Sequence, residues 1–157
     1  MRALYERHAG ALHAYLAGKC GDEALAADVV QDAMLDVWRK AGGFRGQSTV
    51  KTWIFAIARN KLIDRYRASA RHSFVEDPPE VEDEAPNPEA AAAAASDAAR
   101  LRRCLEGLKE AHRTAIRLAF FDDLSHEEIG EIEGVPVGTV KSRIHHAKQL
   151  LMRCLGG

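Results

Sequence analysis

A proline-rich acidic stretch divides the chain of 157 residues and limits what it can fold into. Residues 71–97 contain one basic and eight acidic residues, and residues 76–99 contain four of the five prolines and almost no large apolar side chain. Such a segment buries too little apolar surface to offset the entropy of ordering it. We therefore predict a flexible acidic linker over 71–97, between two small folded domains at 1–70 and 98–157.

Hydrophobic periodicity predicts helices throughout the first domain. One stripe at helical spacing consists of Leu25, Val29, Ala33 and Val37, and the opposite face is expected to carry Asp28, Gln31, Asp32 and Asp36. Gly42 and Gly43 are predicted to end this helix. A second helical pattern follows, with apolar positions at Trp53, Ile54, Ile57, Ala58 and Leu62. Because no convincing strand is found in the sequence, we expect an all-α fold.

The second domain contains the pattern of a helix-turn-helix unit. Ser125 and Glu128 have the spacing of a capping box, Gly134 is a natural helix stop, and Pro136 suits the start of the next helix. That next helix is predicted to bury Val137, Val140, Ile144, Ala147 and Leu151. Its outer face then presents Lys141, Ser142, Arg143, His145, His146 and Lys148. This arrangement is typical of proteins that insert a helix into the DNA major groove.

A second nucleic-acid signal lies in the loop before the Trp53 helix. Phe44 follows Gly43 and precedes Arg45, where its burial is not assured, and Asn60 lies further along the helix. Bases stack on exposed aromatic rings with about 1–3 kcal/mol each, and an asparagine amide can read a base edge. The loop and helix are therefore candidates for binding single-stranded nucleic acid. A random-coil linker of ~27 residues spans roughly 30 Å, about one turn of DNA, so both domains could touch one duplex.

The net charge of −1 hides a segregation of charge. The first 70 residues carry 11 basic and 7 acidic side chains, and residues 98–157 carry 10 basic and 8 acidic side chains. Salt screens charges beyond roughly 10 Å, so nucleic acid responds to each local field rather than to the total. The acidic linker therefore does not exclude DNA binding by its neighbours.

Several other classes of protein are not indicated. No apolar run approaches the ~18 residues of a membrane span, and the charged N-terminus is unlike a signal peptide, so a cytoplasmic protein is expected. The three cysteines, Cys20, Cys104 and Cys154, are widely spaced and form no CxxC pair. This spacing predicts reduced thiols rather than a disulfide framework or a zinc site. Adjacent His145 and His146 point about 100° apart on a helix and do not favour a shared metal ion. No HExxH pattern or serine elbow is present, so no enzyme, metal or cofactor is expected.

The chain resembles the extracytoplasmic-function (ECF) class of bacterial sigma factors, of the sigma-70 family, in two stretches: "AADVVQDAMLDVWRKAGGFRGQSTVKTWIFAIARNKLIDRYR" and "LSHEEIGEIEGVPVGTVKSRIHHAKQLL". The stretches stand on either side of the acidic linker, and with the flanking helices they cover nearly all of the chain outside it. The resemblance implies a protein that binds core RNA polymerase, directs it to promoters and is held inactive by an anti-sigma factor.

In that family the N-terminal domain, region two, docks on the clamp helices of the polymerase β′ subunit and reads the minus-ten promoter element. The resemblance assigns docking to Asp28, Gln31, Asp32 and Leu35, and this chain has Ala27 where many members have Glu. Phe44 and Asn60 are implied to capture bases. Contacts with the DNA backbone are implied for Lys51, Arg59, Lys61, Arg65 and Arg67.

The C-terminal domain is similar to region four, which reads the minus-thirty-five element as duplex and contacts the polymerase β flap. The implied DNA-contacting residues are Thr139, Lys141, Ser142, Arg143, His145, His146 and Lys148. The sequence departs from the family at His145 and His146, where an aromatic residue or Arg is often found, and at Lys109, where Pro is common. The chain begins almost inside its first predicted helix, as a short or trimmed member would, and no additional C-terminal domain is expected.

A stand-alone helix-turn-helix regulator is the alternative interpretation. Its N-terminal domain would dimerise or sense a signal, and neither Phe44 nor Asn60 would need to lie on the surface. Duplex binding by the protein without polymerase, at physiological salt, would favour this alternative.

Overall fold

The computed structural model describes residues 2–70 and 96–156, and residues 71–95 of the predicted linker lie outside this range. The elements, in chain order, are α1 (Arg2–Cys20), α2 (Glu23–Lys40), the 3-10 turn η1 (Ala41–Gly43), α3 (Val50–Ala70), α5 (Asp97–Glu106), α6 (Glu110–Ile116), the π-helical turn η2 (Arg117–Phe121), α7 (His126–Glu133) and α8 (Val137–Gly156). The described residues contain no strand, which confirms the all-α prediction. None of the helices in these two ranges has the length and apolar character needed to cross a membrane.

The first three helices form a bundle around the predicted apolar stripe. Asp22 caps α2 by accepting a hydrogen bond from the Leu25 amide at 3.0 Å. Most of the predicted core positions of α2 and α3 are buried, namely Val29, Ala33, Val37, Ile54, Ile57, Ala58 and Leu62, whereas Leu25 and Trp53 are half-buried. Helix α2 ends at Lys40, and Gly42 and Gly43, the glycines predicted to end it, belong to the 3-10 turn η1 that follows.

The outward placement predicted for Asp36 is wrong. This side chain is buried, and its carboxylate lies 2.7 Å from the Lys61 ammonium of α3. The hydrogen bond from Lys61 is the largest cause of the lowered pKa of Asp36. Asp36 therefore joins α2 to α3 at the margin of the bundle, where the long side chains of Lys61, Arg39 and Lys40 reach its carboxylate and cover it.

The helices α5 to α8 form the second bundle, and its core positions include Leu118, Ile129, Ile132, Val140, Ile144 and Ala147. A disulfide joins Cys104 of α5 to Cys154 of α8, with their Cα atoms 5.9 Å apart. The prediction of three reduced thiols is therefore wrong for this pair, and Cys20 is the free cysteine. The sequence did not indicate this pair, since the two cysteines have a sequence separation of 50 and only the folded bundle brings them together.

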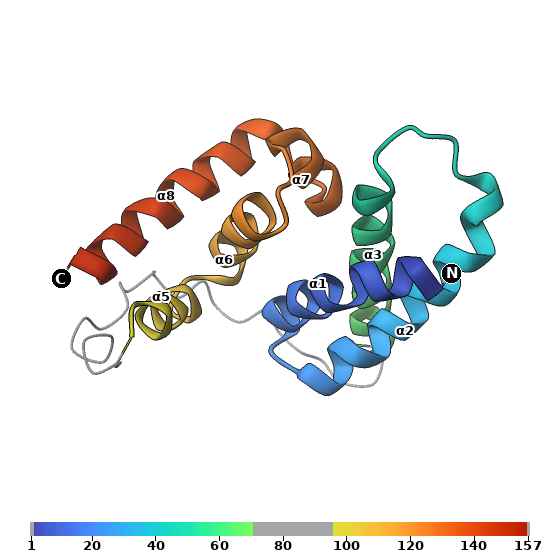
Figure 1. Ribbon diagram of the computed structural model, residues 1–157, viewed down its shortest axis with the longest axis horizontal. Helices are drawn as coiled ribbons and strands as arrows, with labels where there is room; N and C mark the ends of the chain where they lie inside the picture. Colours follow the sequence, from blue (N-terminus) through green and yellow to red (C-terminus); the bar gives the residue numbers. More distant parts are fainter. Residues whose placement is uncertain (1, 71–95, 157) are drawn as a thin grey trace.

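The two bundles pack directly on each other (Figure 1). Helix α3 lies against α7, and α1 lies against α6. One contiguous cluster of buried apolar side chains runs through both bundles, from Leu12 and Phe55 to Leu118 and Ile129. This closed arrangement decides which of the predicted site residues can reach a partner.

Candidate nucleic-acid and partner interfaces

The helix-turn-helix unit has the local structure that its sequence predicts. The Ser125 side chain accepts from the Glu128 amide at 3.1 Å, and the Glu128 carboxylate accepts from the Ser125 amide at 3.1 Å, which completes the capping box. Gly134 ends α7 in the left-handed conformation with φ of 67°. Helix α8 then begins at Val137, so the turn has the tight geometry of a DNA-binding unit.

Helix α8 presents one polar face to solvent. Val140, Ile144 and Ala147 are buried against the bundle. The predicted contact residues on the other side are exposed at Lys141, Ser142, His145, His146 and Lys148, and half-buried at Thr139 and Arg143. The structure therefore places all seven along one helix, on the side away from the core or at its margin.

An exposed aromatic residue extends this face and was missed from the sequence. The Lys148 ammonium lies 5.1 Å from the ring centroid of Phe120, which is 55% exposed at the end of η2. The His112 and His146 rings stand edge to face with centroids 6.0 Å apart. Two consecutive aromatic residues at the end of a helical pattern are weak evidence for an exposed binding surface, because aromatic side chains are usually buried in the core.

Close approach of α7 to α8 depends on Gly130. A Cβ atom built at this position would lie 2.8 Å from the Val135 carbonyl oxygen, which is backbone and cannot swing aside. We expect Gly130→Ala to destabilise the protein by about 1–3 kcal/mol, because overpacking of this kind displaces the turn. Urea unfolding measures the loss. Gly138→Ala is the matched control, since a Cβ there meets nothing within 4 Å and should leave stability unchanged or slightly raised.

A second surface lies on α2, around an open groove of about 360 Å³ lined by Tyr5, Gln31, Met34, Leu35 and Trp38, here called the docking groove. Trp38 is 65% exposed and Leu35 is 46% exposed. Gln31 and Leu35 were predicted site residues, whereas Tyr5, Met34 and Trp38 were not. Leu35 and Trp38 stand three residues apart and off the buried stripe, which is the sequence signal that would have found the apolar half of this surface.

The two acidic residues predicted to dock on polymerase, Asp28 and Asp32, have different surroundings. Asp28 is exposed. Asp32 forms an ion pair with Arg65 of α3, with a nitrogen–oxygen distance of 2.6 Å. This contact joins a predicted docking residue to a predicted DNA-contacting residue, and the paired carboxylate raises the pKa of Arg65 further.

The loop between η1 and α3 holds the predicted base-capturing aromatic in place. Phe44 is half-buried, and its ring centroid lies 4.8 Å from that of Trp53. Asn60 and Arg67 are exposed on α3. Figure 1 shows this loop at the outer edge of the first bundle, reached from the end of α2. Part of the Phe44 ring therefore remains accessible next to α3, the helix that carries the exposed Asn60 side chain.

The N-terminal half of α3 is instead covered by the second bundle. The Lys51 ammonium donates to the Asp122 carbonyl, and the Arg59 guanidinium donates to Glu133 at 2.9 Å. The Thr52 hydroxyl donates to the Glu128 carboxylate at 2.7 Å. Two side chains predicted to contact DNA are thus engaged by groups around α7 in the closed arrangement.

The hydrogen bond from Thr52 is the largest cause of the lowered pKa of Glu128. A lowered folded pKa means that this carboxylate stabilises the protein above its unfolded value of 4.5, and that the contribution is lost as pH falls through the lower folded value. The Glu128 contact is therefore fully present at neutral pH and absent only in acid.

A cluster of four charged side chains, here called the interdomain ion cluster, joins the bundles at Lys19, Arg59, Glu110 and Glu133. Lys19 lies 2.9 Å from Glu133 and 2.7 Å from Glu110. Glu133 is only 6% exposed and pairs with both Lys19 and Arg59. Beside it, Arg113 donates to the Gly18 carbonyl at 2.6 Å. Each of these contacts joins residues on opposite sides of the linker, so the cluster holds the closed arrangement together.

Within the described ranges 2–70 and 96–156, no group of three or more His, Cys, Asp or Glu side chains could hold a metal ion. His145 and His146 have ring centroids 6.1 Å apart and remain on the surface of α8. The chemistry of the described site residues is that of binding through charge, stacking and apolar contact.

Comparison with known proteins identifies the family to which the chain belongs. Residues 4–72 match the family Sigma-70 region 2, and residues 98–151 match Sigma-70, region 4. The ECF RNA polymerase sigma factor RpoE of Cereibacter sphaeroides is 37% identical over 151 residues, covering 92% of this chain and 80% of that protein. The chain belongs to the ECF sigma factors. SigL of Mycobacterium tuberculosis, an ECF relative, is 33% identical over 96% of this chain and 86% of its own length.

Two solved structures share the arrangement of this ECF sigma factor. The sigma factor RpoE bound to the anti-sigma factor NepR, from Bartonella quintana, has a TM-score of 0.71 and 25% identity, over 99% of this chain and 96% of that one. CnrH in complex with the cytosolic domain of CnrY has a TM-score of 0.62 and 25% identity, over 98% of this chain and 86% of that one. The predicted resemblance and the two-domain helical fold are thereby confirmed.

Proposed function

We propose that this ECF sigma factor is an alternative sigma factor that recruits core RNA polymerase and directs it to a set of promoters in the cytoplasm. One observation carries the proposal: the chain presents the basic face of α8 and, on a different helix, the docking groove with its exposed Trp38 and Leu35. A DNA-binding module alone needs only the first. The polymerase performs the chemistry, and this chain supplies recognition without enzymatic activity of its own.

The docking groove suits the clamp helices of the polymerase β′ subunit. Its lining is largely apolar, with Leu35 and Trp38, and includes the polar Gln31, while Asp28 is exposed one turn earlier on the same helix. Interfaces of this kind combine an aromatic anchor in the centre with a polar rim. We therefore assign β′ docking to Asp28, Gln31, Leu35 and Trp38, with Asp32 held in its ion pair with Arg65.

The exposed face of α8 is assigned to the duplex minus-thirty-five element. Lys141 and Lys148 are placed to neutralise phosphates, and the small Ser142 allows close approach of the helix to base edges. Phe44 and Asn60 are assigned to bases of the minus-ten element, with Lys51, Arg59, Lys61, Arg65 and Arg67 as the associated cationic residues.

The closed arrangement is assigned to an inactive state that an anti-sigma factor would hold. Lys51 and Arg59 are engaged by Asp122 and Glu133, so the second domain covers the N-terminal half of α3 and withholds these two cations, while Asn60 stays exposed. Reading both elements at once requires these contacts to break and the two domains to separate.

Transcription in vitro with core polymerase and a library of genomic promoter fragments tests the function. Specific transcripts are expected only when both the chain and core polymerase are present. Tight, sequence-specific duplex binding by the chain alone at physiological salt, without promoter-dependent transcription, would support the stand-alone regulator instead.

Asn60→Ala should impair promoter opening by at least tenfold while leaving polymerase binding intact. The expected loss reflects one amide–base contact needed to offset the few kcal/mol of extruding a base. Permanganate reactivity of the melted minus-ten region measures open complex, and gel filtration with core polymerase measures binding. Ser69→Ala, at another exposed position of α3, is the control, and a normal open-complex yield for Asn60→Ala would remove Asn60 from the proposed site.

A further inference from the structure

The disulfide between Cys104 and Cys154 lies outside the main core. Both residues are buried, at 0% and 1% exposure, and Leu151 packs beside them in a small cluster separate from the main one. The apolar core of the second bundle, with Leu118, Ile129 and Ile144, is complete without the sulfur atoms. The fold of the helix-turn-helix unit therefore does not depend on the disulfide.

Attachment of α5 does depend on it. Helix α5 packs mainly on α8, and its fully buried side chain is Cys104. The Arg100 guanidinium also donates a hydrogen bond to the Leu155 carbonyl at 2.8 Å, and Leu105 adds a partly buried contact with the main core. Most of the other side chains of α5 are exposed. Because Cys104 is the fully buried side chain of α5, the covalent link is a central part of its attachment to α8.

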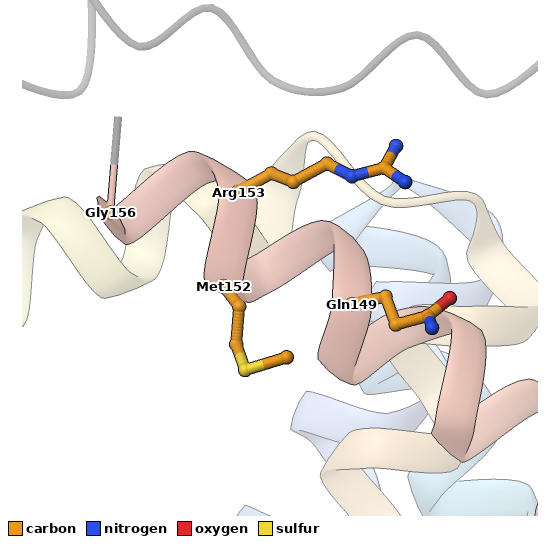
Figure 2. Close-up of a pocket in the computed structure, with 4 residues that line it drawn as sticks. All are labelled: Gln149, Met152, Arg153 and Gly156. Carbon is orange, nitrogen blue, oxygen red and sulfur yellow. The ribbon is translucent and has the colours of Figure 1, made fainter.

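The same link braces the end of α8. Figure 2 shows Met152 and Arg153 projecting to different sides of the last turns of α8, around an open hollow that Gln149 and Gly156 also line. Met152 is 67% exposed, so these turns gain little from apolar burial on that side. Cys154, six residues after the predicted DNA-contacting Lys148, and the Leu155 carbonyl supply contacts with α5.

We propose that Cys104 and Cys154 are a reversible redox modification site that docks and releases α5. A peroxide takes two electrons and two protons from the paired thiols, forms the sulfur–sulfur bond and is reduced to two waters. A dithiol reductant returns the electrons and protons and is itself oxidised to a disulfide. Disulfides in cytoplasmic proteins are usually transient or redox-sensing, and a cytoplasmic location of this chain rests on the proposed function.

Release of α5 changes the connection between the two domains. In the oxidised protein the segment between them ends at Asp97, where α5 begins. In the reduced protein the ten residues of α5 join that segment, and the last turns of α8 lose their brace. The redox state therefore sets the length of chain available when the domains separate.

Thiol counting and hydrogen exchange on the full chain test the proposal. After hydrogen peroxide, intact-mass analysis of the alkylated protein should find one free thiol, at Cys20, and after dithiothreitol it should find three. Amides of α5 should exchange at least tenfold faster in the reduced protein, since loss of the covalent link makes local opening of this helix easier. Amides of α7 should be unchanged.

Two variants keep the test decisive. Cys20→Ser should retain the full response, and Cys104→Ala should show fast α5 exchange under both conditions while far-UV circular dichroism stays close to that of the parent. Three thiols after peroxide, a dimer linked through Cys20 in place of the internal bond, or equal α5 exchange in both states would each overturn the proposal. None of these measurements uses polymerase or DNA, so failure of the proposed function would not alter them.

Discussion

Glu133→Gln is expected to open the closed arrangement. The change removes the buried carboxylate that pairs with both Lys19 and Arg59, and leaves Arg59 without its partner in α7. Loss of one member of a buried ion pair costs several kcal/mol when nothing relaxes. Here Lys19 keeps Glu110, so we expect about 2 kcal/mol, which lowers the closed-to-open ratio roughly thirtyfold.

Two measurements report this opening. Small-angle X-ray scattering should show a larger radius of gyration for the variant. Affinity for a single-stranded minus-ten oligonucleotide should rise by up to about thirtyfold, because Lys51 and Arg59, which the second bundle engages in the closed form, become available in more molecules beside the already exposed Asn60.

The control for this prediction is Glu131→Gln, which removes the same charge from an exposed position of the same helix. It should leave both the scattering and the oligonucleotide affinity at the parent values. If Glu133→Gln behaves in the same way as this control, the interdomain ion cluster does not hold the domains together.

Trp38→Ala should weaken binding to core polymerase by at least thirtyfold. A large aromatic residue at the centre of an interface commonly contributes 2 kcal/mol or more, about this factor in the dissociation constant. Because Trp38 is 65% exposed in the free chain, its removal should change the free energy of unfolding by less than about 0.5 kcal/mol. Titration of labelled core polymerase measures the affinity, and urea unfolding measures the stability.

Tyr66→Ala is the matched control for the docking groove. Tyr66 is an exposed aromatic residue of the same bundle, 46% accessible, but it lies on α3 and does not line the groove. Polymerase affinity should be unchanged in this variant. Equal weakening by both substitutions would mean that general loss of surface aromatics, rather than the docking groove, explains the effect.

Local sequence rules predicted the elements and the helix-turn-helix unit with their caps. The capping box at Ser125 and Glu128 and the helix stop at Gly134 depend on neighbours within a few residues, so the pattern alone identifies them. The exposed face of α8 followed in the same way from the spacing of Val140, Ile144 and Ala147.

Long-range pairing was beyond those rules. Asp36 occupies a position that periodicity assigns to solvent, and the approach of Lys61 from α3 helps to cover it. Cys104 and Cys154, or Lys19 and Glu133, are distant in sequence and become neighbours only when the helices pack. For the predicted DNA-contacting residues, sequence resemblance suggested the candidates, but it carried no information that Lys51 and Arg59 are engaged within the same chain.

Contact between α3 and α7 also weakens the apparent affinity for any partner that needs the two domains apart. A ligand that requires the open form binds with a dissociation constant divided by the open fraction, so one open molecule in roughly a hundred would weaken apparent affinity about a hundredfold. If polymerase and promoter each bind the separated form more tightly, they would share that cost and thereby bind cooperatively, although they need not touch the same residues. The self-contact held by Glu133 would in this way make the response depend on both partners being present together.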